Sequence, residues 1–104
     1  MNLHHLEFVV GVAERGGFRR AAADLHVSQS ALSRAVAAIE ARVGARLFHR
    51  SGQGTTLTRV GEAYVAAARE VLAAHRALEA AVRAARAASA DVPEAADGVL
   101  SRAG

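Results

Sequence analysis

The stretch Ser28-Gln29-Ser30-Ala31-Leu32-Ser33-Arg34 opens a predicted helix that continues to about Gly44. Apolar side chains recur at helical spacing and predict one buried face, made by Leu32, Val36, Ile39 and Val43. The opposite face carries small residues, hydroxyls and one arginine: Ser30, Arg34, Ala37 and Ala41, with Ser33 on the flank. Ser28 is a favourable N-cap and Gly44 a favourable stop, so both ends of the helix are marked.

The exposed face of this helix is unusual for a solvated surface because it is not lined with Glu and Lys. Small residues allow close approach to a DNA major groove, and Arg, Gln and Ser can meet phosphates and base edges there. An ordinary amphipathic helix with an Ala-rich exposed face shows the same pattern. The helix alone therefore leaves both interpretations open.

Two shorter helices are predicted upstream. Residues 3 to about 15 have an apolar face and end at Gly16-Gly17, and residues 18 to about 25 form the second helix. Only His26-Val27 separates this helix from Ser28, so the two helices must cross steeply, as in a helix-turn-helix. We interpret His26 as a turn residue, because His tolerates a left-handed backbone; a chemical role is the alternative.

A small β-hairpin is predicted after Gly44, where the helical periodicity stops. Residues 47–50 and 55–58 are β-tolerant, and the turn-forming residues 51–54 connect them. The expected anchors to the core are Leu47, Phe48 and Leu57. The side chains expected along a phosphate backbone are Arg46, His49 and Arg50. Directly after a helix-turn-helix, such a hairpin is typical of a wing; a plain surface hairpin is the alternative.

One long helix is predicted from Arg59 to about Ala88, since no breaker interrupts it. Thr58 can cap this helix, and about thirty residues at about 1.5 Å each give it a length of about 45 Å. A heptad-like seam runs along it: Tyr64, Ala68, Val71, His75, Leu78, Val82 and Ala85, with Val65 and Leu72 beside it. We expect the seam to need a partner helix, because the preceding residues 1–58 cannot cover it. We interpret His75 as a half-buried spacer, with a pH switch as the alternative.

Composition limits the function classes. The 104 residues contain no Cys, which excludes a disulfide framework and a thiolate metal site. No apolar run approaches the ~20 residues that span a membrane, and residues 1–5 lack a signal-peptide pattern, so we expect a cytoplasmic protein. Apart from the adjacent His4-His5 there is no His pair with metal-ligand spacing, and no Gly-rich phosphate loop lies between a strand and a helix. We therefore expect no enzyme activity, no cofactor and no metal.

Positive charge is concentrated in the first half of the chain. Residues 1–59 hold eight Arg against four acidic residues, whereas residues 60–104 hold five Arg against six acidic residues. A nucleic-acid-binding surface requires such a concentration of positive charge, whereas a module that only dimerises or binds other proteins would not need it.

These motifs together resemble one known family. The run Ala21-Ala22-x-x-Leu25-His26-Val27-Ser28-Gln29-Ser30-Ala31-Leu32-Ser33-Arg34, then Ile39-Glu40, Gly44-x-x-Leu47-Phe48-x-Arg50 and Leu57-Thr58-x-x-Gly61, is similar to the N-terminal DNA-binding domain of LysR-type transcriptional regulators.

The resemblance covers about residues 2–88. It implies a mainly α fold: a winged helix-turn-helix of three helices and a hairpin wing over residues 1–58, then a linker helix over residues 59–88. In the family that helix pairs antiparallel with its mate to form a dimer. Residues 89–104 are expected to be a flexible linker or the stub of an effector-sensing domain, which alone would take a small-molecule effector. Whether the chain is cut from a longer protein or is a natural short regulator is left open.

The chain departs from the family pattern beside the DNA. Where the family commonly has Ser and Thr around the Phe of the second helix, this chain has Gly17 and Arg19. Gly is the weaker cap, and Arg19 would replace a hydroxyl–phosphate contact with a charged one. Ser30 stands where the family often has Pro, and it adds a hydrogen-bonding side chain on the DNA face.

We therefore expect a dimeric, sequence-specific DNA-binding transcriptional regulator that reads a pseudo-palindromic operator in double-stranded DNA. The predicted DNA-contacting residues are Arg19, Arg20, Ser28, Gln29, Ser30, Ser33, Arg34, Arg50 and Thr58, the last through its N–H. The predicted dimer interface is Tyr64, Ala68, Val71, Leu72, His75, Leu78 and Val82. The alternative is a helical dimerisation or interaction module without specific DNA binding.

Overall fold

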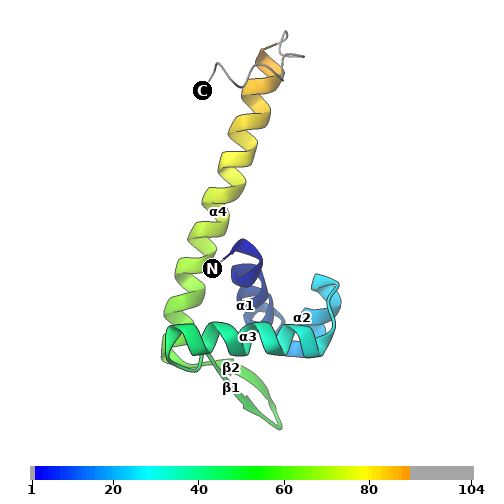
Figure 1. Cartoon of the computed structure of the whole chain (residues 1–104), viewed down its shortest axis with the longest axis vertical. Coiled ribbons are helices and arrows are strands. Elements are labelled where there is room, and N and C mark those ends of the chain that lie inside the picture. The colour runs from blue at the N-terminus through cyan, green and yellow to red at the C-terminus, as the bar shows by residue number, and fades with distance from the viewer. Residues whose placement is uncertain (1, 90–104) are drawn as a thin grey trace. The chain divides into compact units, whose positions relative to one another are not determined.

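The computed structural model describes residues 2–89, so nearly all of the predicted linker or stub at residues 89–104 lies outside the described residues. The elements in chain order are α1 (Leu3–Arg15), α2 (Phe18–Leu25), α3 (Gln29–Val43), β1 (Phe48–Ser51), β2 (Gly54–Leu57) and α4 (Arg59–Ala88) (Figure 1). The predicted fold class, a winged helix-turn-helix followed by a long helix, is confirmed. The chain divides into two units, Met1–Leu72 and Ala73–Gly104, and α4 runs from the first into the second.

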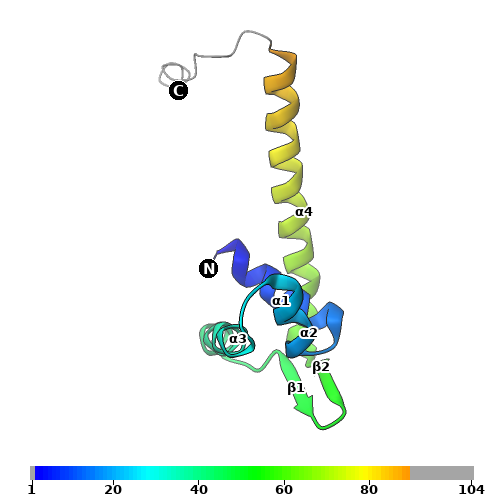
Figure 2. The ribbon, with the colours of Figure 1, turned by 90° about the vertical axis from the view of Figure 1, so that its right-hand side faces the viewer.

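The helix ends follow the local signals of the sequence. The Ser28 Oγ accepts the Ala31 N–H at 3.0 Å, so Ser28 caps α3 as predicted. His26 ends α2 in the left-handed conformation with φ 60°, and Gly44 ends α3 with φ 82°. The predicted turn between α2 and α3 is therefore confirmed, and it sets the steep crossing of these helices (Figure 2).

The core of the first unit is built from the three short helices, the base of the hairpin and the first half of α4. The largest of its fully buried side chains are Val9, Val12, Leu32, Val36, Ile39, Leu47, Phe48 and Val65. One member of the predicted apolar stripe of α3 differs: Val43 is 38% exposed. Val43 lies in the last turn of α3, directly before Gly44, and the core covers it less fully than it covers Leu32, Val36 and Ile39.

The hairpin is tighter than predicted. Phe48 pairs with Leu57 and Ser51 with Gly54, so only Gly52-Gln53 remains as the turn. The Ser51 Oγ accepts the Gln53 N–H at 3.2 Å and donates to the Gly54 carbonyl at 3.3 Å. These bonds draw Ser51 and Gly54 into the strands.

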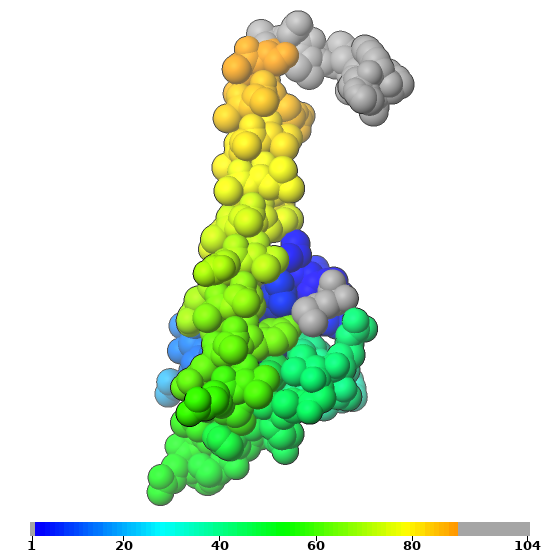
Figure 3. Space-filling model, turned by 90° about the vertical axis from the view of Figure 1, so that its left-hand side faces the viewer, coloured from blue at the N-terminus to red at the C-terminus, as the bar shows by residue number. Residues whose placement is uncertain are grey.

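The first half of α4 belongs to the core of the first unit. It buries Gly61, Val65, Ala68 and Leu72, and it lies next to α1 and α3 in the space-filling view (Figure 3). Gly61 permits a close approach: a Cβ there would lie 2.0 Å from the Leu47 carbonyl oxygen. The start of α4 and the base of the hairpin can therefore touch only because this residue has no side chain.

Candidate nucleic-acid interface

The outer face of α3 is exposed, as predicted. Gln29, Ser30 and Arg34 are exposed, Ser33 on the flank is partly buried, and Ala37 and Ala41 continue the face. Ser28 lies at its start, with its Oγ 3.4 Å from that of Ser30. The one acidic residue of α3, Glu40, is only 8% exposed. The exposed face of α3 therefore carries no negative charge.

The N-terminus of α2 supplies cationic groups. Gly17, which has no side chain to cap the helix, stands at the N-cap of α2, and the first turn holds no acidic residue. Arg19 and Arg20 are exposed, and within residues 2–89 neither forms an ion pair. Free N–H groups and unpaired guanidinium groups together favour an anion at this helix end.

The wing is held beside the N-terminus of α2 by aromatic contacts. The Arg50 guanidinium carbon lies 3.9 Å from the centroid of the Phe18 ring. The Phe18 and Phe48 rings meet edge to face, with centroids 5.7 Å apart. A guanidinium stacked on a ring keeps its N–H donors in its own plane, so Arg50 can still bind a phosphate.

Thr58 is placed differently from the prediction, because its polar groups are used inside the chain. Its N–H donates to the Leu47 carbonyl at 2.9 Å, so the N–H is not available to a phosphate. Its Oγ1 donates to the Arg46 carbonyl at 2.7 Å and accepts the Gly61 N–H at 2.9 Å. Thr58 is thus a helix cap that joins α4 to the start of the wing, and we remove it from the DNA-contacting residues.

Several other arginines are used in ion pairs within the first unit. Arg15 pairs with Asp24, Arg69 with Glu14 at 3.3 Å and Arg46 with Glu40 at 3.4 Å. Arg46, expected along a phosphate backbone, is therefore tied to a buried carboxylate. Arginines of this unit that form no ion pair within the described residues include Arg19, Arg20, Arg34 and Arg50.

Glu40 is the important residue that the sequence reasoning missed. Its Oε2 accepts the Leu47 N–H at 2.8 Å and the Phe48 N–H at 3.4 Å. The sequence did indicate that Glu40 is buried. Glu40 lies four residues after Val36 and directly after Ile39, so helical periodicity places it on the buried face of the helix. A carboxylate in that position requires partners of its own.

The predicted dimer seam divides into a covered and an uncovered part. Ala68 and Leu72 are buried in the core of their own chain, so these two do not form a free surface as expected. Tyr64 packs against the same core, and burial raises the pKa of its phenol above the ordinary value for tyrosine. The uncovered members are Val71 at 47% exposure, Leu78 at 61% and Val82 at 50%. His75 lies on the same helix, with its Nε2 3.2 Å from the Glu79 Oε2.

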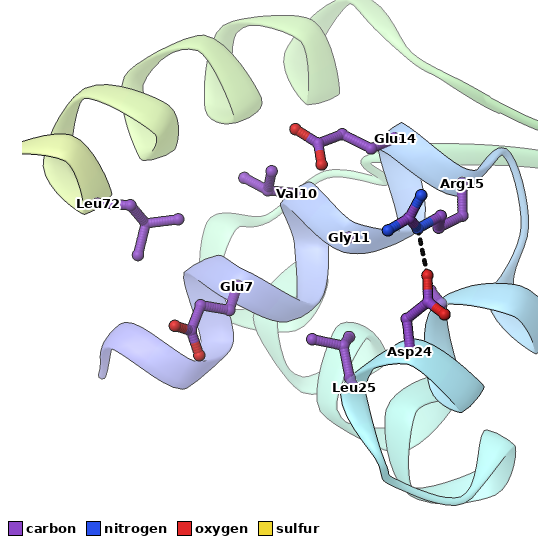
Figure 4. A pocket seen from close by; sticks show the side chains of 9 residues that line it. Glu7, Val10, Gly11, Glu14, Arg15, Asp24, Leu25 and Leu72 are labelled. Atoms are coloured by element: carbon purple, nitrogen blue, oxygen red, sulfur yellow. Dashed lines mark ion pairs between the residues drawn. The ribbon is translucent and has the colours of Figure 1, made fainter. Parts of the chain in front are cut away.

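A cavity of about 240 Å³ opens between α1, α2 and Leu72 (Figure 4). The carboxylates of Glu7, Glu14 and Asp24 lie around it, and Asp24 pairs with Arg15. Its volume is below the roughly 300–1,000 Å³ of most ligand pockets, and ion pairs occupy its rim.

Neither a metal centre nor a membrane span is present in the described part of the chain. Within residues 2–89 no group of three or more His, Asp and Glu residues is placed to hold a metal ion. None of the described helices combines the length and apolarity needed to cross a bilayer.

Comparison with known proteins identifies this architecture. The family model of the bacterial regulatory helix-turn-helix proteins of the LysR family matches residues 3–62. The HTH-type transcriptional regulator TfdT of Cupriavidus pinatubonensis is 42% identical over 73 residues, which are 70% of this chain and 32% of that protein. The chain spans about a third or less of the length of the curated relatives it matches.

Solved structures agree with the sequence relatives. Full-length OxyR C199D from Pseudomonas aeruginosa is 38% identical with a TM-score of 0.76, over 81% of this chain and 28% of that chain. The DNA complex of the CbnR DNA-binding domain is 39% identical with a TM-score of 0.73, over 83% of this chain and 100% of that chain. The curated relatives are named as HTH-type transcriptional regulators. The chain belongs to the LysR family of bacterial regulatory helix-turn-helix proteins, and it contains the DNA-binding domain of that family.

Proposed function

We propose that two copies of this chain bind a pseudo-palindromic operator in double-stranded DNA, each with α3 in the major groove. The observation that carries the proposal is the exposed face of α3, which offers Gln29, Ser30 and Arg34 while its one carboxylate is buried. A similar chain, the CbnR DNA-binding domain, is bound to DNA. The helix-turn-helix places its second helix against base edges.

The residues divide into two roles. Gln29, Ser30, Ser33 and Arg34 are the candidates for base edges or adjacent phosphates. Arg19, Arg20 and Arg50 are the candidates for the phosphate backbone, since they lie at the start of α2 and on the wing. The Ser28 hydroxyl accepts a backbone N–H as a cap and can still donate its own proton to a phosphate oxygen.

The second half of α4 supports a homodimer. Val71, Leu78 and Val82 follow heptad-like spacing and are about half exposed or more. Fully burying an exposed large apolar side chain is worth roughly 1.5–3 kcal/mol. Covering the exposed half of each of these side chains is worth a corresponding share of that, so a partner helix would stabilise the pair. By the family resemblance the two helices run antiparallel, and their pairing would set the distance between the two recognition helices. The alternative, a helical dimerisation or interaction module without specific DNA binding, shares this pairing and differs from the proposal only in whether the chain binds DNA.

The salt dependence of DNA binding tests the proposal. Labelled random-sequence duplex and a duplex selected from a random library by this chain would be titrated by fluorescence anisotropy at several salt concentrations. Log affinity is expected to fall linearly with log salt, with a slope of about −0.9 for each phosphate neutralised.

Single variants sharpen this measurement. Arg20→Ala should make the slope shallower by about one for each copy bound, because one phosphate contact is lost. Arg76→Ala, which removes an exposed arginine of the second unit, is the matched control and should leave the slope unchanged. A flat dependence for the unaltered chain would contradict DNA binding through these arginines.

A further inference from the structure

The buried carboxylate of Glu40 lies where α3 meets the segment that leads into the wing. Its Oε2 accepts the Leu47 N–H at 2.8 Å and the Phe48 N–H at 3.4 Å, and its Oε1 lies 3.4 Å from the Arg46 Nε. The Glu40 side chain is only 9% exposed, whereas that of Arg46 is 64% exposed. The carboxylate thus binds three consecutive residues from a helix that ends before them.

The same short segment is held from the other side by α4. The Thr58 N–H donates to the Leu47 carbonyl, and the Thr58 Oγ1 donates to the Arg46 carbonyl. Gly61 packs directly on the Leu47 carbonyl oxygen. The start of the wing is therefore fixed between two helices, and Glu40 is its link to α3.

These hydrogen bonds matter because the segment is buried. Leu47 and Phe48 are 0% and 2% exposed, so their N–H groups have little access to water. A buried N–H without a partner is destabilising, and an ionised acceptor gives a shorter and stronger hydrogen bond than a neutral one. Without the carboxylate, this segment would have to move to find other acceptors.

Movement of this segment would change the wing. β1 begins at Phe48, and Arg50 lies two residues further along the strand, over the Phe18 ring. A shift at Leu47 and Phe48 would therefore displace the cation that the wing presents. α3 itself, capped at Ser28 and Gly44, would keep its own exposed face.

We propose that Glu40 is a positioning residue for DNA recognition, whose buried carboxylate holds the wing against the recognition helix α3. Glu40 touches no DNA and acts through the wing. The inference rests on the proposed function, and it adds a residue that faces away from the DNA to the determinants of affinity. A role in general stability differs from this one, because it would weaken every DNA contact alike.

A pair of double-mutant cycles separates these two roles. The probe is the fluorescein-labelled duplex selected by the unaltered chain, and anisotropy is measured at a temperature where circular dichroism shows each variant to be folded. One cycle combines Glu40→Ala with Arg50→Ala on the wing. The matched cycle combines Glu40→Ala with Arg34→Ala on α3. Glu40→Gln, which keeps an acceptor oxygen and the side-chain volume, replaces Glu40→Ala in both cycles if the latter does not fold.

We expect the effect of Glu40→Ala to be coupled to that of Arg50→Ala on the wing but not to that of Arg34→Ala on α3. Glu40→Ala should weaken binding about tenfold and Glu40→Gln by less, because Gln retains an acceptor for the two N–H groups. Arg50→Ala should weaken binding about tenfold in the unaltered chain but only about twofold in the Glu40→Ala background, since the wing is already displaced. Arg34→Ala should have the same effect in both backgrounds.

Two results would count against the proposal, and they are distinguishable. If Arg50→Ala weakens binding by the same factor in both backgrounds, Glu40 does not act through the wing, although DNA binding stands. If the unaltered chain enriches no duplex from the random library, the proposed function itself is wrong.

Discussion

The two units of this chain use the same kind of apolar pattern in different ways. In Met1–Leu72 the first half of α4 buries Val65, Ala68 and Leu72 against the core of its own chain. In the second unit, which begins at Ala73, the continuation of the same helix leaves Leu78 61% and Val82 50% exposed. One continuous helix therefore contributes to an internal core and also presents an uncovered apolar surface.

The difference shows that a heptad-like spacing does not reveal which chain covers it. The spacing places apolar side chains on one face of the helix. A core, a second copy or solvent can meet that face, and each gives a different consequence for substitution. In the first unit a substitution should change folding, whereas in the second it should change pairing.

The largest effect is expected from Leu78→Glu in the second unit. A charge in the proposed helix pair has no partner there, so the dimer should dissociate while the first unit stays folded. Operator affinity should then fall about a hundredfold or more, because two-site binding is lost. Sedimentation equilibrium and binding to the selected duplex measure the two effects.

Ala80→Glu is the matched control for Leu78→Glu. Position 80 lies on the opposite side of the helix and is exposed, so the same charge should leave the dimer intact. A monomeric unaltered chain at micromolar concentration, or a dimeric Leu78→Glu variant with full affinity, would show that the second unit does not pair copies.

In the first unit, Gly61→Ala should lower the free energy of unfolding by about 3 kcal/mol. The new Cβ would lie 2.0 Å from the Leu47 carbonyl oxygen, which is backbone and cannot rotate away. Gly11→Ala in α1 is the control: its Cβ would lie 3.1 Å from the end of the flexible Leu25 side chain. There the gain of up to about 1 kcal/mol in helix propensity should offset the crowding. Urea denaturation measures both, and equal losses would refute the close-approach argument.

Arg34→Ala tests base recognition separately from dimerisation. It should weaken binding to the selected duplex by roughly 1–3 kcal/mol if Arg34 contacts a base. The affinity for random duplex should then fall less, and sedimentation equilibrium should show that the dimer is unchanged. If Arg34 meets only phosphate, both affinities should fall together and the salt slope should become shallower by about one. Unchanged binding to both duplexes would show that Arg34 contributes nothing to DNA binding.

The smallest effect is expected from Arg69→Ala, which removes the ion pair with Glu14. The two side chains are 54% and 51% exposed, and exposed pairs contribute less than about 1 kcal/mol. The His75–Glu79 pair of the second unit is of the same exposed kind, formed within one helix. Thermal unfolding of Arg69→Ala should therefore stay close to that of the unaltered chain. A loss above about 2 kcal/mol, well beyond what an exposed pair contributes, would show that the pair, and not only apolar packing, holds α4 to α1.

The sequence by itself determined the helices, their ends and the tight turn. These features depend on neighbours within a few residues: Ser28 caps its own first turn, His26 adopts the left-handed conformation, and no breaker interrupts residues 59–88. The exposed face of α3 follows from the same short-range geometry, so helical periodicity alone is enough to place Gln29 and Arg34 on it.

Tertiary structure decided which residues each polar group binds and which surface covers each helix face. The Thr58 N–H, which was predicted to bind a phosphate, is taken by the Leu47 carbonyl, eleven residues earlier in the chain. Glu40 is buried because two N–H groups seven and eight residues away need an acceptor. Leu72 is covered by its own chain and Leu78 is not, although both lie on one regular helix. The physical reason is shared: periodicity states which side chains lie together, whereas hydrogen-bond partners and covering surfaces come from residues that only the folded chain brings close.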